Sequence, residues 1–244
     1  MKITKASQNN KMIRKTICIT GYKGNIGQVL TAGLKHEYEL LLLDLPDTNL
    51  LDYQMVKNQL KDKHISVIIH LAWNCKTENY ASKASDPNNL TMANHVYQVA
   101  LELKIPKVIM ASSVHTHDVY KIINEELNVI IDLNTKPDPV SPYGESKIKI
   151  EETGKQFSKK GIQVICIRFG GVCTQASPWS DTPYLGLSHP DCVDLLEQCI
   201  ESNIKNNYLI IYGVSDNDKA IHNLKNPINW TPKIKATDFY HINS

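Results

Sequence analysis

From residue 15 onward the chain alternates short apolar runs with longer amphipathic runs, and this alternation restricts its fold more than any other feature. Short apolar runs are typical of buried strands, and the longer runs between them are typical of helices. Right-handed crossover connections would place these helices on both faces of a parallel sheet. We therefore predict a doubly wound α/β fold with a small C-terminal portion that binds substrate.

The pattern predicts six strands and five helices. The expected strands are Thr16–Thr20, Glu39–Asp44, Val67–Ala72, Lys107–Ser112, Gln163–Phe169 and Tyr208–Tyr212. The expected helices run from about Asn25 to His36, Asp52 to Lys63, Asn88 to Leu103, Tyr143 to Lys160 and Pro190 to Asn203. Residues 1–12 are mostly polar, and we expect them to form a flexible N-terminal arm. Because no repeat or linker divides the rest of the chain, we expect a single domain over 13–244. Substrate-binding loops are expected at about 173–190 and 213–244.

Composition excludes several classes of partner. An apolar content of 42% with 21% charged residues indicates a packed core. A formal charge of +2 with scattered lysines argues against nucleic acid, and no apolar stretch reaches the roughly 20 residues that span a membrane. Six cysteines without a C-x-x-C pair are expected to be free thiols in a cytoplasmic protein.

A glycine-rich loop, TGYKGNIG at 20–27, follows the first predicted strand and precedes the first helix. In such a loop Gly21 permits a tight turn, Gly24 lets backbone amides approach a pyrophosphate, and Gly27 allows close packing of helix and strand. The helix N-terminus adds partial positive charge. The sequence therefore predicts a Rossmann-type dinucleotide site, although glycines kept for packing alone are an alternative.

Asp44 ends the second predicted strand, where a carboxylate can accept hydrogen bonds from an adenosine ribose. The same carboxylate would repel the 2′-phosphate of NADP, so we expect NAD as the cofactor. Lys23, inside the glycine loop, could meet a phosphate and leaves NADP as the less favoured alternative.

Tyr143 and Lys147 stand four residues apart in SPYGESK, within a predicted helix. One helical turn brings the ammonium near the phenol, and a positive charge there stabilises the phenolate form. Such a phenolate can remove the proton of a substrate hydroxyl while hydride leaves the same carbon for a nicotinamide. The alternative is an exposed helical pair, but Ser112 and Ser113 end a neighbouring strand and are expected in the same crevice.

These motifs together resemble the extended short-chain dehydrogenase/reductase superfamily, which includes NAD-dependent epimerases and dehydratases. The glycine loop, HLAW at 70–73 and YGESK carry the resemblance over nearly the whole chain. Within the superfamily, ASSVHT at 111–116, IRFGG at 167–171, LSHPDCVDLLEQCI at 187–200 and NWTPK ending at Lys233 resemble the uronate dehydrogenase branch.

The resemblance implies a role for each matching residue. Tyr143 would be the base, with Lys147 as its electrostatic partner, Ser113 orienting the substrate and Asn94 supporting a proton relay. Cofactor contacts are implied for Gly21, Gly24, Asn25, Ile26, Gly27, Asp44, Leu71, Ala72, Tyr143 and Lys147.

The implied sugar contacts are Ser113, His115 and Arg168, and an arginine there could hold a carboxylate in a bidentate grip. Val114 stands where the branch has an asparagine. Taken without the resemblance, His115 could be an ordinary loop histidine and Arg168 a structural ion pair. His115 and His117 lack further ligands at a suitable spacing, so no metal site is expected.

The resulting hypothesis is an NAD-dependent enzyme that oxidises a free sugar or sugar acid at its anomeric carbon. One alternative is a nucleotide-sugar epimerase, dehydratase or ketoreductase using the same Tyr143 and Lys147. A second is a dinucleotide-binding regulator without turnover. The superfamily often forms dimers, and a homodimer is expected.

Overall fold

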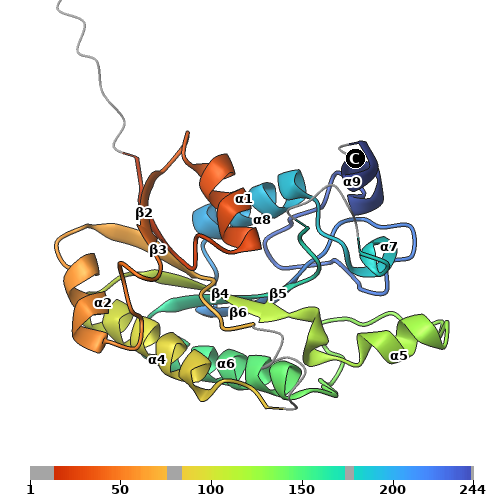
Figure 1. The fold of residues 1–244 in the computed structure, drawn as a ribbon, viewed down its shortest axis with the longest axis horizontal. Helices are drawn as coiled ribbons and strands as arrows, with labels where there is room; N and C mark the ends of the chain where they lie inside the picture. Colours follow the sequence, from red (N-terminus) through yellow and green to blue (C-terminus); the bar gives the residue numbers. More distant parts are fainter. Residues whose placement is uncertain (1–13, 76–83, 174–178, 243–244) are drawn as a thin grey trace, which may run out of the picture.

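The computed structural model describes residues 14–75, 84–173 and 179–242 and contains one six-stranded, fully parallel sheet (Figure 1). The strand order is β2-β1-β3-β4-β5-β6. The strands are β1 (Thr16–Thr20), β2 (Glu39–Leu43), β3 (Ile65–His70), β4 (Lys107–Ser113), β5 (Gln163–Phe169) and β6 (Tyr208–Gly213). This arrangement confirms the predicted doubly wound, Rossmann-type fold.

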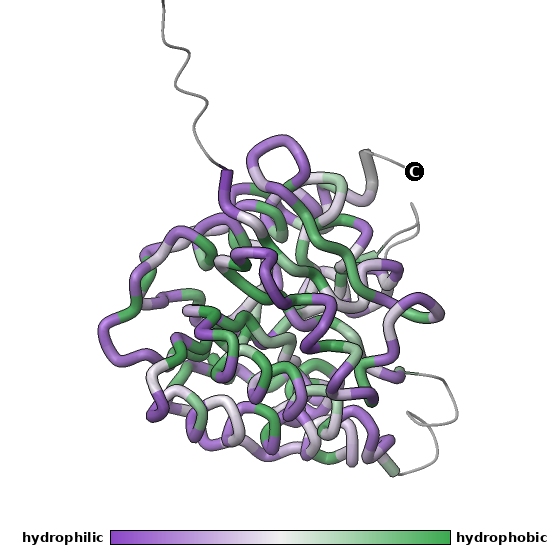
Figure 2. The backbone as a smooth tube through the Cα atoms, turned by 90° about the vertical axis from the view of Figure 1, so that its left-hand side faces the viewer, coloured by the Kyte–Doolittle hydropathy of each residue, from purple (hydrophilic) through white to green (hydrophobic). Residues whose placement is uncertain are grey.

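Helices cover both faces of the sheet, as Figure 1 shows. One face carries α1 (Asn25–Leu34) and α8 (His189–Glu201), which pack on each other. The other face carries α2 (Tyr53–Leu60), α4 (Pro87–Glu102) and α6 (Pro142–Ser158). A separate apolar core fills the space on each side of the sheet, and in Figure 2 the hydrophobic segments gather in the interior of the chain trace.

Capping side chains set the starts of the long helices. Asp52 caps α2, Asp86 caps α4, Ser141 caps α6 and Ser188 caps α8, each by accepting a hydrogen bond from a first-turn amide. Proline in the first turn of the last three helices fixes a helical φ where no backbone donor is needed. The predicted boundaries of these helices therefore lie within a few residues of the observed ones.

The chain reverses direction across the sheet at β1. Helix α1 leads from β1 to its neighbour β2, and α2 then returns past β1 to β3 on its other side. The loops that follow β1 and β3 consequently separate at the carboxyl edge, which is where open α/β sheets bind ligands.

Short elements build up this edge beyond the sheet. The 3₁₀ turn η1 (Val114–Thr116) and α5 (Val119–Asn124) follow β4, and α7 (Thr182–Leu185) and α9 (Ala236–Ile242) follow β5 and β6. They are too short to show a helical periodicity, and the sequence did not predict them. Ile131 pairs with the 221–223 backbone, so the segment after β4 is joined to the C-terminal portion.

Other sequence expectations differ in their outcome. All six cysteines are free thiols, as predicted, and five of them are buried. No helix within the described ranges is long and apolar enough to cross a membrane, and no three His, Cys, Asp or Glu side chains among those residues gather as metal ligands would. The expected arm over 1–12 lies outside the described residues.

Candidate active site

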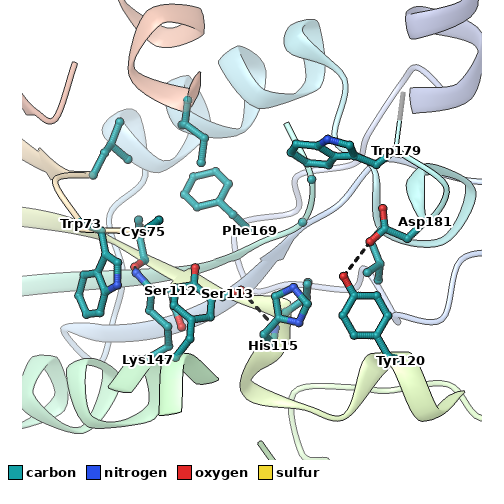
Figure 3. A pocket seen from close by; sticks show the side chains of 18 of the residues that line it. Trp73, Cys75, Ser112, Ser113, His115, Tyr120, Lys147, Phe169, Trp179 and Asp181 are labelled. Atoms are coloured by element: carbon teal, nitrogen blue, oxygen red, sulfur yellow. Dashed lines mark hydrogen bonds between the residues drawn. The ribbon is translucent and has the colours of Figure 1, made fainter. Parts of the chain in front are cut away.

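A cavity of about 560 Å³ lies at the carboxyl edge and extends from the start of α1 and the end of β3 past the ends of β4 and β5. Figure 3 shows two ends: Trp73, Cys75 and Lys147 lie at one, and Trp179 and Asp181 lie at the other. The lining comes from the start of α1, the residues after β3, the ends of β4 and β5, helices α5 and α6, and the segment leading to α7. Segments far apart in the sequence therefore meet in one cavity.

The glycine loop packs tightly against the sheet at the end near Trp73. Gly21 has φ +72° and lies so close to the Ala72 backbone that a Cβ there would be 2.5 Å from the Ala72 nitrogen. A Cβ on Gly27 would be 2.5 Å from the Gly21 carbonyl oxygen. These two glycines are required by the packing of the chain itself.

Gly24 differs from both. A Cβ on Gly24 would meet the Gly21 oxygen only at 3.4 Å, an ordinary contact, so packing alone does not require a glycine there. Gly24 is also the N-cap of α1 and has no side-chain cap, which leaves first-turn amides of this helix for another acceptor. The loop therefore fits an anionic group at the helix N-terminus, as a dinucleotide pyrophosphate would be.

Asp44 follows β2 beside this loop and is partly buried. Its carboxylate accepts hydrogen bonds from the Lys23 amide at 3.0 Å and the Leu45 amide at 2.8 Å. A carboxylate oxygen can accept more than one hydrogen bond, so the geometry leaves room for ribose hydroxyls. The Lys23 ammonium donates to the Leu45 carbonyl.

Tyr143 and Lys147 lie one turn apart on α6, and both line the cavity. The Ser141 cap and Pro142 fix the start of this helix immediately before the tyrosine. The Lys147 nitrogen is 5.4 Å from the centre of the Tyr143 ring, 3.5 Å from the centre of the Trp73 ring and 2.9 Å from the Ala111 oxygen. The ammonium is thus held against the floor of the cavity beside the phenol.

Burial lowers the pKa of Lys147 to about 7, while Cys75 and Glu151 act in the opposite direction. The Trp73 ring face and the Ala111 carbonyl both favour the charged form. At neutral pH the lysine is therefore close to half protonated, and a small change in its surroundings will change the protonated fraction.

The two serines at the end of β4 have different partners. Ser112 also lines the cavity, but its hydroxyl already donates to the Glu151 carboxylate at 2.6 Å. The Ser113 oxygen accepts a hydrogen bond from the His115 amide at 3.2 Å and lines the cavity. Ser113 is therefore the serine better placed to meet a substrate in the cavity.

Arg168 does not line the cavity. Its guanidinium makes two hydrogen bonds of 2.9 Å to the carboxylate of Glu151, and both side chains are almost fully buried. A third contact of 3.1 Å joins Arg168 to the Tyr212 hydroxyl. The structure thus places Arg168, on β5, in a buried ion pair with Glu151 of α6. This is the structural alternative that the sequence left open.

The far end of the cavity consists of His115, Tyr120, Trp179 and Asp181. The Tyr120 hydroxyl donates to the Asp181 carboxylate at 3.2 Å. The Trp179 ring lies over Gly171, where a Cβ would approach it to 2.8 Å. Burial lowers the pKa of His115, which keeps its ring neutral at pH 7.

The remaining predicted residues are distributed around the site. Ile26 and Leu71 line the cavity, whereas Ala72 lies beneath Gly21. Asn25 begins α1. Asn94 is partly buried on α4 and does not line the cavity.

Sequence reasoning missed several residues around the site, among them Glu151, Trp73, Trp179 and Asp181. Glu151 follows Lys147 by one helical turn, and this spacing could have suggested its place on the same face of α6. Trp73 directly follows the strand motif HLA. Trp179 and Asp181 lie in a loop without periodicity, and only its richness in Pro, Ser and Asp marked it as functional.

The fold and site define a Rossmann-type dinucleotide-binding protein with a tyrosine–lysine pair in its cavity. Residues 17–178 match the NAD dependent epimerase/dehydratase family. Because the match covers more than half of the chain, the protein belongs to this family.

Two curated relatives are sugar dehydrogenases. Uronate dehydrogenase of Pseudomonas putida is 28% identical over 222 residues, covering 82% of this chain and 76% of the relative. L-arabinose 1-dehydrogenase (NAD(P)(+)) of Haloferax volcanii is 24% identical over 226 residues, covering 83% of this chain and 89% of the relative.

A solved structure shares the fold. A mutant of uronate dehydrogenase from Agrobacterium tumefaciens, complexed with NAD, matches with a TM-score of 0.75 and 20% identity. The match covers 95% of this chain and 91% of that one. At this identity the likeness supports the fold and leaves the substrate to the site itself.

Proposed function

We propose that the protein is an NAD-dependent dehydrogenase that oxidises a free sugar at its anomeric carbon. The observation that carries this proposal is the meeting of Ser113, Tyr143 and Lys147 in one cavity that also borders the glycine loop. The relationship to an arabinose dehydrogenase and a uronate dehydrogenase supports the substrate class.

Residues that follow the carboxyl ends of β1 and β2 would hold the cofactor. The amides at the start of α1 suit the pyrophosphate, and Asp44 suits the adenosine ribose. Lys147 suits the nicotinamide ribose at the inner end. A bound nicotinamide dinucleotide supplies a hydride acceptor, which none of the protein side chains can provide.

Tyr143 would handle the proton of the reaction. As a phenolate it takes the proton from the anomeric hydroxyl, while the C1–H bond gives its electron pair away as hydride and the C1–O bond becomes a carbonyl. The charge of Lys147 favours the phenolate, because an adjacent cation stabilises an anion. Ser113 would hold the same substrate oxygen in place, and the product is a lactone.

NAD is favoured over NADP by the position of Asp44. In the proposed cofactor position the 2′-phosphate of NADP would approach the Asp44 carboxylate, and the Lys23 ammonium that could offset this charge already donates to the Leu45 carbonyl. Repulsion between the two anions is expected to weaken NADP binding.

The first test follows absorbance at 340 nm while the purified protein receives NAD with uronic acids, neutral aldoses, sugar phosphates and nucleotide sugars. The proposal predicts NADH formation with a free sugar. Conversion of a nucleotide sugar without net NADH would instead identify an epimerase or dehydratase. NAD binding with no conversion of any substrate would identify a regulator.

A further inference from the structure

The formal charges of the cavity are divided between its two ends. Among the described residues that line it, Lys147 and Asp181 are the charged side chains. Lys147 lies at the cofactor end, against Trp73, whereas Asp181 lies at the far end beside Trp179 (Figure 3). If a sugar occupies the cavity as proposed above, the part of the sugar remote from its anomeric carbon faces the carboxylate.

At the far end, no described lining residue carries a positive charge that would offset the Asp181 carboxylate at pH 7. Arg168 is paired through both 2.9 Å hydrogen bonds with Glu151 and lies outside the lining. Burial lowers the pKa of His115, so its ring is neutral at pH 7. A sugar acid entering this end would thus bring a second anion beside Asp181.

The Asp181 carboxylate is directed away from its own helix. It occupies the N-cap position of α7, where an aspartate usually accepts a first-turn amide, but it makes no such hydrogen bond. It accepts the Tyr120 hydroxyl instead, across the end of the cavity. A carboxylate has about four acceptor positions, so further hydroxyl donors can bind there.

Trp179 completes this end with a flat apolar surface. Its ring lies over Gly171, and half of the side chain remains exposed. The carbon–hydrogen face of a sugar ring suits an indole face, while the sugar hydroxyls at the ring edge suit a carboxylate. Both features match an uncharged polyhydroxy ligand.

We propose that Asp181 determines substrate choice and makes the cavity select a neutral aldose over the corresponding sugar acid. Neutral aldoses are then the substrate class of the dehydrogenase site proposed above, on which this role of Asp181 rests. Asp181 accepts hydrogen bonds from hydroxyls of a neutral sugar and repels a carboxylate in the same position. Its effect is on binding in both the ground state and the transition state, so it acts on kcat/KM.

The test compares galactose with galacturonate, and glucose with glucuronate, at saturating NAD. Each pair differs only in the group at C6, so the ratio of kcat/KM values isolates the charge. The wild type is expected to favour the neutral sugar by at least about tenfold, which corresponds to about 1.4 kcal/mol. Asp181→Asn, which keeps the shape and removes the charge, is expected to reduce that ratio by about tenfold.

A matched control separates the local charge from the net charge of the protein. Asp62→Asn makes the same change at an exposed residue just before β3, at the opposite edge of the sheet. Its φ of 61° suits asparagine as well as aspartate, so the control is expected to fold. The ratio should remain that of the wild type in Asp62→Asn. Raising the salt concentration should shrink the wild-type preference, because the repulsion is screened.

A wild type that prefers galacturonate, or an unchanged ratio in Asp181→Asn, would overturn the inference and leave the dehydrogenase function standing. Absence of NADH with all four sugars and with the wider panel would overturn the proposed function and this inference with it.

Discussion

The two ends of the cavity are built in different ways. At the cofactor end the glycine loop is one contiguous segment, and backbone contacts of Gly21 and Gly27 fix its tight packing. The substrate end joins Tyr120 and Asp181, which are 61 residues apart in the sequence, through one side-chain hydrogen bond. The contrast suggests that the cofactor end is constrained by folding, while the substrate end is free to vary with the sugar.

The largest effect is expected on the free energy of unfolding, when the buried Arg168–Glu151 pair is broken. Arg168→Ala would leave the buried Glu151 carboxylate without its ion-pair partner and should lower the free energy of unfolding by about 3–5 kcal/mol. It should leave the neutral-to-acid preference unchanged, because Arg168 does not line the cavity. Denaturant unfolding and the galactose–galacturonate ratio measure the two quantities.

Arg14 provides the matched control for this variant. Its pair with Glu39 is exposed, so Arg14→Ala should cost no more than about 1 kcal/mol. If Arg168→Ala kept its stability and lost activity on sugar acids alone, Arg168 would be a substrate ligand and the proposed division of charges would be wrong.

Lys147 lies at the cofactor end, against Trp73, and its titration gives the next largest effect. The folded pKa is about 7, below the ordinary value of 10.5, so the unfolded chain binds more protons between these two values. The destabilising contribution of Lys147 should therefore shrink as the pH increases from 7 to about 10.

Lys147→Met removes this titration. The variant should be more stable than the wild type at pH 7 by up to a few kcal/mol, and its advantage should shrink as the pH rises. Thermal unfolding across the range measures the difference, with Lys149→Met, exposed on the same helix, as the control. A constant difference at every pH would contradict the assigned burial of the lysine charge.

Asp44 gives the smallest of these effects and tests the cofactor end. Asp44→Ser should raise kcat/KM with NADP relative to NAD by about tenfold, or about 1.4 kcal/mol. This value lies between the roughly 1 kcal/mol of two unit charges about 4 Å apart in water and the roughly 4 kcal/mol of such a pair near a protein surface. Asp47→Ser, a more exposed neighbour, should change the ratio less. Equal ratios in wild type and Asp44→Ser would remove Asp44 as the selector.

The sequence predicts those parts of the molecule that depend on local signals. The six strands and the long helices were predictable because apolar periodicity and capping residues are local signals. Tyr143 and Lys147 were predictable as neighbours because four residues make one helical turn. Ser113 could be expected beside them because parallel strands end at one edge of the sheet.

The substrate end lacked such signals. No periodicity connects Tyr120 with Asp181, and each lies in or beside a short helix that propensity does not reveal. Arg168 shows the same limit, because its partner Glu151 comes from a different element and only the packing of α6 on β5 brings them together. These pairs join residues far apart in the sequence, so local sequence patterns could not predict them.

The most direct test of the central claim compares two tyrosines that line the same cavity. With NAD and a sugar oxidised by the wild type, Tyr143→Phe should lower kcat by about 10²–10⁴-fold, the usual contribution of a general base. It should retain its affinity for NAD, measured by calorimetry. Tyr120→Phe, which removes the hydroxyl that donates to Asp181, should keep most of its turnover. Nearly full activity in Tyr143→Phe would contradict the account, because the proton would then leave by another route.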